Sequence, residues 1–220
     1  MIRESRKRPD VAKEESLVTY NAPNSKISEQ YRVIRTNLQF TSANRKKRTI
    51  VITSPNLGEG KSTTTTNLAV SIAQQGEKVL IIDADLRNPA IHTIFKLENT
   101  IGLTSILIGQ ATLDGAVNQT EIGRVDVLTS GPVPFNPAEL LGSAAMETLI
   151  SKAMERYDVI LFDSSPLLEL TDTSILANQC DGVILVLSCN RTKNEDTLAA
   201  KRILSFTRAE LIGAILNNKV

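Results

Sequence analysis

The sequence predicts an α/β fold with a doubly wound, mostly parallel sheet. Short runs of β-branched and apolar residues alternate with helical stretches along most of the chain, and this strand, helix, strand order is typical of parallel sheets. Several of these runs are apolar almost throughout, as strands covered on both faces must be. With 220 residues and 41% hydrophobic side chains, the chain is long enough to bury one sizeable core.

The elements follow one another in a regular order. Residues 1–26 lack periodicity and contain Pro9 and Pro23, so a flexible N-terminal arm is expected there, followed by a single domain over residues 27–220. Strands are predicted at residues 49–53, 79–82, 125–128, 159–162, 183–187 and 211–216. Helices are predicted at residues 28–40, 61–75, 137–155, 172–178 and 194–206.

The strongest chemical signal is a glycine loop between the first predicted strand and a helix. Glycines let backbone amides approach phosphate oxygens, and the following helix N-terminus adds a positive dipole. Lys61 is expected to reach the terminal phosphates and Ser62 to ligate Mg²⁺. The common spacing GxxxxGK[ST] would place a glycine at Pro55, so this loop is a variant. The residues predicted to bind nucleotide are Gly58, Glu59, Gly60, Lys61, Ser62 and Thr63.

Aspartates follow two of the predicted strands. Asp83 and Asp85 come after residues 79–82, and Asp163 comes after residues 159–162. Ligands of open parallel sheets lie outside the carboxyl ends of the strands, so these carboxylates are expected to meet the phosphates. Asp163 has the setting of a residue that holds Mg²⁺, and Asp83 and Asp85 are expected either to hold the ion or to accept a proton. The alternative is that each aspartate only caps a turn.

Two motifs together resemble a known family. The glycine loop and the pattern Asp83-x-Asp85-x-Arg87 resemble the bacterial tyrosine kinases (BY-kinases), whose fold is related to the P-loop ATPases MinD and ParA. The resemblance covers about residues 26–218 and includes residues 131–141, which match the family's segment before its long helix. Within the family, the sequence is most similar to the separate cytoplasmic kinases of Gram-positive capsule and exopolysaccharide loci.

The resemblance implies an ATP-dependent protein-tyrosine autokinase that regulates capsule or exopolysaccharide synthesis or export. It implies ATP and Mg²⁺ as cofactors, protein tyrosines as substrates, and a membrane adaptor of the polysaccharide co-polymerase type as the partner. The protein is then expected in the cytoplasm, held peripherally at the inner face of the membrane by that adaptor. Glu29, Arg32 and Arg35 match the first-helix signature that the family uses to assemble rings, whereas their spacing alone also fits an intrahelical charge ladder.

The resemblance also supplies site residues. Catalytic roles are expected for Lys61, Asp83, Asp85 and Arg87, and metal ligation for Ser62, Asp83 and Asp163. Arg87 is a candidate cation beside the phosphates, with an ion pair that shapes the turn as its alternative. Asn217 ends the last predicted strand, where relatives of this fold contact adenine, although a turn-forming asparagine fits equally.

Composition excludes some classes of partner and compartment. The chain has 25 basic and 24 acidic residues, so no strong global field draws it to nucleic acid, and no nucleic-acid partner is expected. Its longest uninterrupted apolar run, residues 183–187, is far below the roughly 20 residues of a membrane-spanning helix. Two cysteines without a disulfide framework, and no apolar signal core, favour the cytoplasm.

Two other functions compete with the kinase. MinD- and ParA-type ATPases carry a signature lysine that reaches the partner's phosphates, and Asn56 stands at that position. A nucleotide-dependent scaffold that assembles without phosphorylating any protein is the third hypothesis. The sequence also departs from the kinases, because Ser165 replaces the first proline of their DxPP pattern. They usually carry a C-terminal tyrosine cluster, whereas the tyrosines of this sequence are Tyr20, Tyr31 and Tyr157. Either the sequence is shortened or the substrate tyrosine lies elsewhere.

Overall fold

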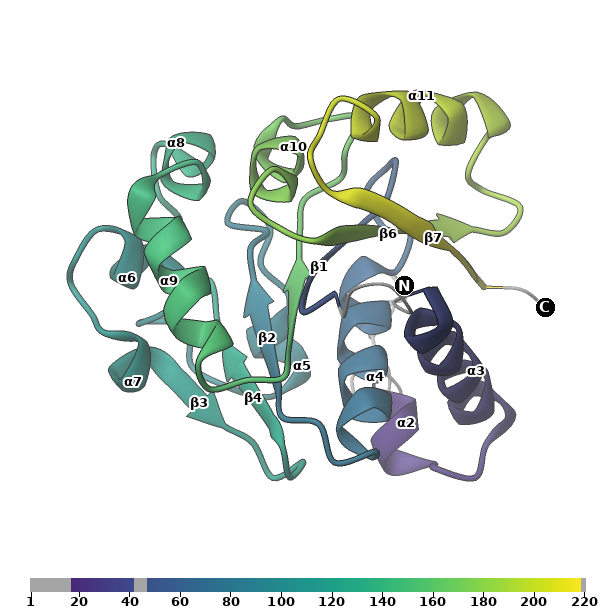
Figure 1. Cartoon of the computed structure of the whole chain (residues 1–220), viewed down its shortest axis with the longest axis horizontal. Coiled ribbons are helices and arrows are strands. Elements are labelled where there is room, and N and C mark those ends of the chain that lie inside the picture. The colour runs from purple at the N-terminus through teal and green to yellow at the C-terminus, as the bar shows by residue number, and fades with distance from the viewer. Residues whose placement is uncertain (1–16, 42–46, 219–220) are drawn as a thin grey trace, which may run out of the picture.

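The computed structural model describes residues 17–41 and 47–218, which form a seven-stranded twisted sheet with helices on both faces (Figure 1). The strand order is β3-β4-β2-β5-β1-β6-β7. Every neighbouring pair is parallel except β3 and β4, which are antiparallel at one edge. The strands are β1 (Thr49–Thr53), β2 (Val79–Asp83), β3 (Val117–Gln119), β4 (Val125–Leu128), β5 (Val159–Asp163), β6 (Gly182–Ser188) and β7 (Glu210–Asn217).

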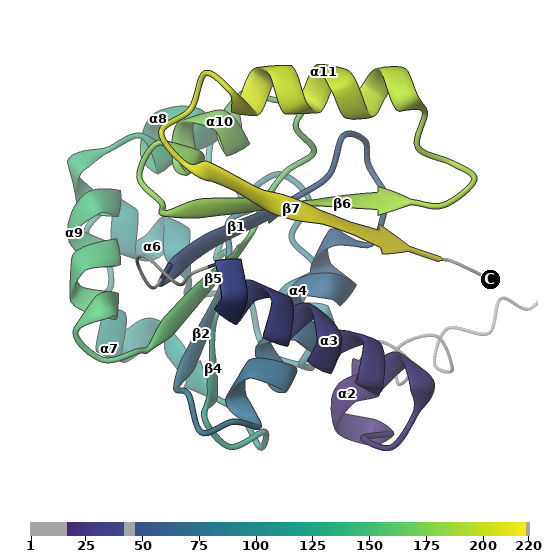
Figure 2. The ribbon, with the colours of Figure 1, turned by 45° about the vertical axis from the view of Figure 1, so that its right-hand side comes forward.

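Each face of the sheet has its own hydrophobic core. Side chains alternate along a strand, so Ile50 and Ile52 of β1 enter one core while Val51 enters the other. The first face is covered by α2 (Val18–Asn21), α3 (Lys26–Thr41), α4 (Lys61–Ala73) and α5 (Ile91–Ile94). The second face is covered by α6 (Leu103–Leu107), α7 (Leu113–Ala116), α8 (Pro137–Leu141), α9 (Ala144–Met154), α10 (Asp172–Ala177) and α11 (Asn194–Leu204). Figure 2 shows α3 beside α4 and α11 above β6 and β7.

The doubly wound, mostly parallel fold is confirmed, and all six predicted strands form with ends within one residue of the prediction. One predicted helix is wrong, because residues 137–155 form two helices, α8 and α9. The break falls at Gly142 and Ser143, where the Ser143 hydroxyl accepts a hydrogen bond from Met146 N at 3.3 Å. Serine is a preferred N-cap residue, so α9 begins afresh there.

The expected N-terminal arm also needs correction. Residues 1–16 lie outside the described residues, but residues 17–26 are not a free arm. They contain α2, which packs against α4, and Thr19 is fully buried there. The backbone of Thr19 is held from both sides, because its N–H donates to Asn67 Oδ1 at 2.8 Å and its carbonyl accepts from Gln74 Nε2 at 3.3 Å. The single domain expected for residues 27–220 stays a prediction.

Within the part of the chain that the structure describes, no helix is long and apolar enough to cross a membrane. The carboxyl ends of β1, β2 and β5 lie together, because these three strands are parallel and adjacent. This edge of the sheet carries the glycine loop after β1 and the aspartates that end β2 and β5.

Candidate nucleotide-binding site

The glycine loop joins β1 to the N-terminus of α4. Gly58 and Gly60 have φ angles of 75° and 94°, a left-handed conformation that costs other residues energy. A Cβ atom on Gly60 would also stand 2.1 Å from Asn217 Nδ2, so a side chain there would have to displace the Asn217 amide. The first backbone hydrogen bond of α4 runs from Thr64 N to Gly60 O at 2.9 Å. The backbone amides before Thr64 therefore make no hydrogen bond within α4, and this end of the helix can bind an anion.

A surface pocket of about 350 Å³ lies in front of this loop. Its lining includes five of the six loop residues predicted to bind nucleotide, and Glu59 is the exception because its side chain is buried. Asn217, the seventh residue predicted to bind nucleotide, does not line this pocket. Asp85 lines the same pocket, so the loop and the second strand end do converge as the sequence predicts. The lining residues are Leu57, Gly58, Gly60, Lys61, Ser62, Thr63, Asp85, Asn88, Ala90 and Ile94.

Buried Glu59 holds the loop in shape from within. Its carboxylate accepts hydrogen bonds from Asn56 N at 3.1 Å and from the Thr192 hydroxyl at 2.6 Å. Asn56 also donates through Nδ2 to Asp196 Oδ2 at 3.0 Å, which ties the loop to the start of α11. Because a buried carboxylate is costly unless it is hydrogen-bonded, these contacts stabilise one conformation of the loop. Glu59 therefore acts on the nucleotide site through loop shape.

Replacing Thr192 with valine removes the shortest of these hydrogen bonds and leaves one carboxylate oxygen of buried Glu59 poorly satisfied. The expected result is a loss of about 1–3 kcal/mol in the free energy of unfolding, together with weaker ATP binding. Thermal unfolding and calorimetric titration with Mg·ATP measure the two effects. Thr192→Ser keeps the hydroxyl and is expected to behave like the parent protein. An unchanged Thr192→Val variant would show that the loop needs no such support.

Two further side chains reach the loop from β7 and from the turn after β6. Asn217 Nδ2 donates to Glu59 O at 2.9 Å, and Arg191 Nη1 donates to Gly58 O at 2.9 Å. The structure thus places Asn217 at the phosphate loop itself, through an amide that supports the backbone. Its expected contact with adenine stays a prediction.

Asp163 lies beside the loop at the end of β5 and is fully buried. Its Oδ1 accepts a hydrogen bond from the Thr65 hydroxyl at 3.3 Å, and its Oδ2 is buried with no hydrogen-bond partner among the described residues. Burial raises the pKa of Asp163 to about 7, against the opposing effects of the Ser62 hydroxyl and the Lys61 ammonium. Asp163 is therefore a carboxylate whose negative charge is incompletely balanced by the protein.

Asp83 pairs in register with Asp163 across β2 and β5. Its Oδ2 accepts hydrogen bonds from Ala90 N and Ile91 N, both at 3.0 Å, while its Oδ1 is buried and finds no partner in the part of the chain that the structure describes. Burial, followed by repulsion from Asp163, raises the pKa of Asp83 well above its ordinary range. Two adjacent carboxylates thus each keep one buried oxygen that the protein does not satisfy.

Asp85 differs from the other two aspartates because it faces the pocket. Its Oδ1 accepts hydrogen bonds from the Ser165 hydroxyl at 2.9 Å and from Asn88 N at 3.2 Å. These bonds fix the carboxylate while its side chain lines the space in front of Lys61. Of the two residues predicted as proton acceptors, Asp85 is the one with access to a ligand in this pocket.

The residues present fit a magnesium ion shared with phosphate. Mg²⁺ prefers oxygen ligands and is usually held by one or two carboxylates together with substrate phosphates and waters. The unsatisfied oxygens of Asp83 and Asp163 and the hydroxyl of Ser62 supply that donor set. Among the described residues, no three His, Cys, Asp or Glu side chains form a metal site by themselves, so the phosphates would have to complete the shell.

Arg87 forms an ion pair, which is the alternative role expected for it from the sequence. Its Nε donates to Asp172 Oδ2 at 2.8 Å and its Nη2 to Asp172 Oδ1 at 3.2 Å. This two-point contact links the turn after β2 to the start of α10 and occupies the guanidinium. A role for Arg87 as the cation beside the phosphates stays a prediction.

The three residues of the expected assembly signature do not share one environment. Glu29 and Arg32 form a surface ion pair at 2.6 Å, and Arg32 Nη2 also donates to Pro23 O at 2.5 Å. Arg35 instead donates to Ser71 O of α4 at 2.6 Å within the same chain. The structure therefore separates Arg35, which joins α3 to α4, from the more exposed pair of Glu29 and Arg32.

Several residues around the site were not singled out from the sequence. Thr65, Thr192 and Asp196 contact the loop or its aspartate, and each looks locally like an ordinary polar residue of a helix or turn. Asn56 and Ser165 were noted only as departures from family motifs, although both donate hydrogen bonds within the site. Those departures were the available signal, since each substituted position belongs to a motif.

The chain is similar to known families of nucleotide-binding proteins. Residues 47–207 match the family described as AAA domain. The chain is 49% identical over 204 residues to tyrosine-protein kinase YwqD of Bacillus subtilis (strain 168), covering 93% of this chain and 86% of that protein. It is 35% identical over 201 residues to the putative tyrosine-protein kinase CapB of Staphylococcus aureus, covering 91% and 88%.

Solved structures are similar over the same region. The chimerical protein CapA2B2 superposes with a TM-score of 0.90 at 38% identity, covering 93% of this chain and 90% of that one. The septum site-determining protein MinD of Pyrococcus horikoshii, complexed with Mg-ADP, gives a TM-score of 0.65 at 27% identity, covering 77% and 69%. The likeness to the kinase CapB and to the CapA2B2 chimera extends over more of the chain than the likeness to MinD.

Proposed function

We propose, given that this chain belongs to the bacterial tyrosine-protein kinases and carries their AAA-type nucleotide-binding domain, that its glycine loop and strand-end aspartates transfer the γ-phosphoryl group of ATP to protein tyrosines. The observation that carries the proposal is the convergence of Lys61, Asp85 and the unsatisfied oxygens of Asp83 and Asp163 at one edge of the sheet. A phosphate cradle beside buried, unbalanced carboxylates suits Mg·ATP.

The chemistry is positioning and charge neutralisation, because phosphoryl transfer needs little covalent help from the protein. The loop amides and the Lys61 ammonium orient the β- and γ-phosphates and balance their charge. The tyrosine oxygen attacks the γ-phosphorus, the bond to the β,γ-bridging oxygen breaks, and ADP leaves. Asp85, which lines the pocket, receives the phenolic proton. Magnesium held by Ser62, Asp83 and Asp163 would neutralise charge on the phosphate oxygens when bound.

The competing ATPase function is less well supported. Asn56, at the position of the MinD and ParA signature lysine, is bound within its own chain to Asp196 and to Glu59. An asparagine held in this way has no ammonium to offer a partner's phosphates. Identity over almost the whole chain also favours the tyrosine kinases, at 49% for YwqD against 27% for MinD.

The proposed cellular role follows from the family. The kinase would phosphorylate itself and other protein tyrosines, regulate capsule or exopolysaccharide synthesis, and work at the inner face of the membrane with an adaptor of the polysaccharide co-polymerase type. The similarity to CapB and to the CapA2B2 chimera supports this role. ATP and Mg²⁺ are the cofactors of the proposed reaction.

The test incubates the purified chain with Mg·ATP and a synthetic glutamate–tyrosine copolymer, with and without the cytoplasmic segment of a candidate adaptor. Mass spectrometry reads phosphotyrosine, and a coupled assay reads ADP release. A kinase labels tyrosine and releases ADP in proportion. ADP release without phosphotyrosine would identify an ATPase, and binding of ATP without either product would identify a scaffold.

Ring assembly is proposed to use the exposed pair of Glu29 and Arg32. A head-to-tail contact between this pair and a neighbouring copy would generate a closed ring if the rotation closes. Replacing both residues with alanine is expected to shift the protein toward monomer in sedimentation, with ATP binding retained. The fold should survive, because a surface ion pair contributes about 0–1 kcal/mol, the hydrogen bond from Arg32 to Pro23 O that is lost with it contributes about 0.5–1.5 kcal/mol, and alanine favours helix.

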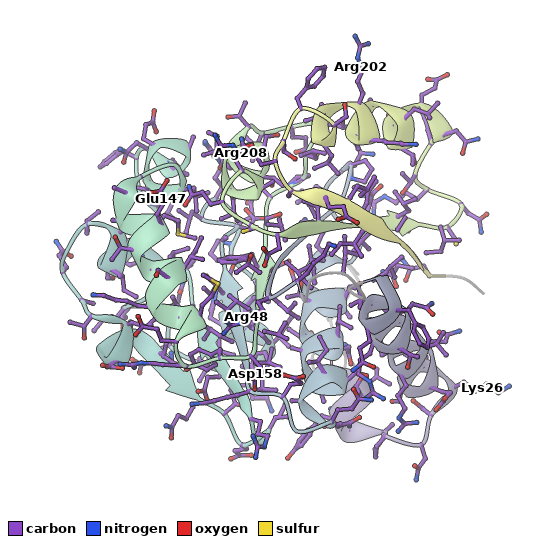
Figure 3. The ribbon with its side chains drawn as sticks, viewed as in Figure 1. Lys26, Arg48, Glu147, Asp158, Arg202 and Arg208 are labelled. Carbon is purple, nitrogen blue, oxygen red and sulfur yellow. The ribbon has the colours of Figure 1, made fainter. Side chains whose placement is uncertain are left out.

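The matched control replaces Glu147 and Lys152 of α9, an exposed acid and base on the other face of the sheet (Figure 3 labels Glu147). This variant is expected to sediment like the parent. If the Glu29 and Arg32 variant also sediments like an oligomeric parent, the two side chains are only an intrahelical pair. Arg35 is kept in both variants because its hydrogen bond to Ser71 O supports the packing of α3 on α4.

A further inference from the structure

The three tyrosines of the sequence differ sharply in how much of the residue reaches solvent. Tyr20 is 46% exposed, whereas Tyr31 is 8% and Tyr157 is 5% exposed. A tyrosine can be phosphorylated only if its hydroxyl reaches the γ-phosphate in a separate active site. The structure therefore ranks the tyrosines of this sequence as acceptors, with Tyr20 first.

The other two tyrosines are held inside the molecule. The hydroxyl of Tyr157 donates to Asp126 Oδ2 at 2.8 Å, and Lys78 Nζ lies 4.9 Å from the centre of its ring. Tyr31 belongs to the core beneath α3 and α4. Burial raises the pKa of both phenols, which also disfavours the deprotonation that accompanies attack on phosphorus. Either residue would have to leave the core before it could react.

Tyr20 points away from the core because its neighbour Thr19 points into it. Thr19 is fully buried and its backbone is bonded to α4 on both sides. Tyr20 lines the wall of an open hollow of about 780 Å³, together with residues from α5 and from the turn between β3 and β4. Its ring is thus presented on the surface by a helix that is itself fixed.

The fixed position of α2 favours attack on the nucleotide of another copy over attack on that of the same chain. α2 is bonded to Asn67 and Gln74 of α4, whereas the phosphate loop adjoins Lys61 at the start of that helix. These residues lie 6 and 13 positions further along α4, which at 1.5 Å per residue places α2 about 9 to 20 Å along the axis from the loop. An acceptor held there is better placed for the active site of another molecule.

The segment that follows Tyr20 is bonded to α3, the helix that carries the pair we propose for assembly. Ser28 Oγ donates to Ala22 O at 2.7 Å, and Arg32 Nη2 donates to Pro23 O at 2.5 Å. Both bonds anchor the connection between α2 and the first turns of α3. A copy that docks on Glu29 and Arg32 would therefore contact a surface to which the segment after Tyr20 is fixed.

We propose that Tyr20 is a phosphorylation site of this protein, modified by a second copy of the same chain. The inference rests on the proposed kinase function. The hydroxyl oxygen of Tyr20 forms the bond to the γ-phosphorus of the ATP held by the other copy. The bond from that phosphorus to the β,γ-bridging oxygen breaks, ADP leaves, and the phenolic proton passes to Asp85 of the copy that holds the ATP.

The test maps phosphotyrosine by mass spectrometry in the full chain after incubation with Mg·ATP. It uses the adaptor condition that labels the glutamate–tyrosine copolymer more strongly. The expected result is phosphate on Tyr20, and a fall of about tenfold or more in total phosphotyrosine of the chain when Tyr20→Phe removes only the exposed hydroxyl. Tyr157→Phe is the matched control and is expected to keep the label. Copolymer labelling without label on Tyr20 overturns the inference and leaves the kinase function standing. No labelling of either overturns both.

A mixing experiment tests whether the transfer is between copies. The acceptor is the Lys61→Met variant, which keeps Tyr20 but lacks the phosphate-binding ammonium, and the donor is the Tyr20→Phe variant. Label on Tyr20 of the Lys61→Met chain supports transfer between copies. If that chain stays unlabelled in the mixture while the parent protein labels its own Tyr20, transfer occurs within one molecule and this part of the inference is wrong.

Discussion

Replacing Lys61 with methionine is expected to reduce tyrosine phosphorylation by about a hundredfold or more, because it removes a preorganised positive charge beside the transferring phosphate. Lys61 is the first residue of α4, is nearly buried, and lines the pocket in front of the glycine loop. Methionine has similar length and favours helix, so α4 is expected to keep its structure. Initial rates of copolymer labelling measure the effect, and circular dichroism checks the fold.

ATP affinity separates the role of Lys61 in the site from a role in folding. Loss of a charge-assisted contact is expected to weaken ATP binding in calorimetric titration as well as turnover. Lys201→Met, at an exposed position of α11, is the matched control and is expected to bind ATP and label substrate like the parent. ATP affinity that stays at the parent's value in Lys61→Met would contradict the assignment of the loop.

The strands were predictable because their signal is local. The runs that form β1, β2 and β5 are buried on both faces of the sheet, so their sequences indicate a strand even in isolation. β3 has three residues, two partly buried and one exposed, and it depends on its antiparallel pairing with β4. No pattern of that length distinguishes a strand from a turn. For this reason the sequence does not predict β3.

Helix boundaries failed where one polar residue decides the outcome. The spacing of apolar residues continues from α8 into α9, so periodicity alone predicts one helix over residues 137–155. The hydroxyl of Ser143 satisfies the amide of Met146 and restarts the helix. A Gly-Ser pair inside a helical pattern is a usable signal for such a break.

The motifs of the phosphate site could be predicted from the sequence, but the hydrogen bonds that connect them could not. Loop glycines and strand-end aspartates carry their meaning in the adjacent sequence, and the sheet topology brings them together. The hydrogen bond from Thr192 to Glu59 joins positions 133 residues apart, and that from Ser165 to Asp85 joins positions 80 apart. Spacing also placed Arg35 on the face of Glu29 and Arg32, although it donates to Ser71 O of α4. Such long-range contacts have no local signature.

Replacing Asp163 with asparagine is expected to lower the rate of phosphorylation by about a hundredfold or more, because it removes a negative charge proposed to hold Mg²⁺ at the phosphates. The same change is expected to stabilise the protein in the absence of nucleotide and Mg²⁺. Asparagine keeps an oxygen that can accept the hydrogen bond from Thr65, and it removes a buried charge that stands in register with Asp83. Activity and stability should therefore change in opposite directions.

The control is Asp158→Asn, which removes a carboxylate at the other end of β5. Asp158 precedes the strand and accepts a hydrogen bond from Lys78 N at 2.8 Å, whereas Asp163 is the last residue of the strand. Figure 3 labels Asp158 near Arg48. Asparagine can accept the same bond. This variant is expected to label substrate at the parent's rate, which ties the loss in Asp163→Asn to the carboxyl end of the strand.

The pH dependence of stability distinguishes a strained functional carboxylate from a structural one. Burial raises the pKa of Asp163 to about 7 in the folded protein, against about 4 in the unfolded chain. The folded state therefore binds this proton more tightly, so the ligand-free protein is expected to lose stability as pH rises from about 4 to about 7. An asparagine side chain cannot ionise, so the Asp163→Asn variant should lose less over that interval. Above about pH 7, the variant should melt several degrees higher than the parent, since a difference of a few kcal/mol in the free energy of unfolding corresponds to such a shift in a domain of this size. If the Asp163→Asn variant instead melts well below the parent at pH 8, the ionised carboxylate stabilises the fold. Its hydrogen bonds would then stabilise the folded protein by more than the burial of its charge costs.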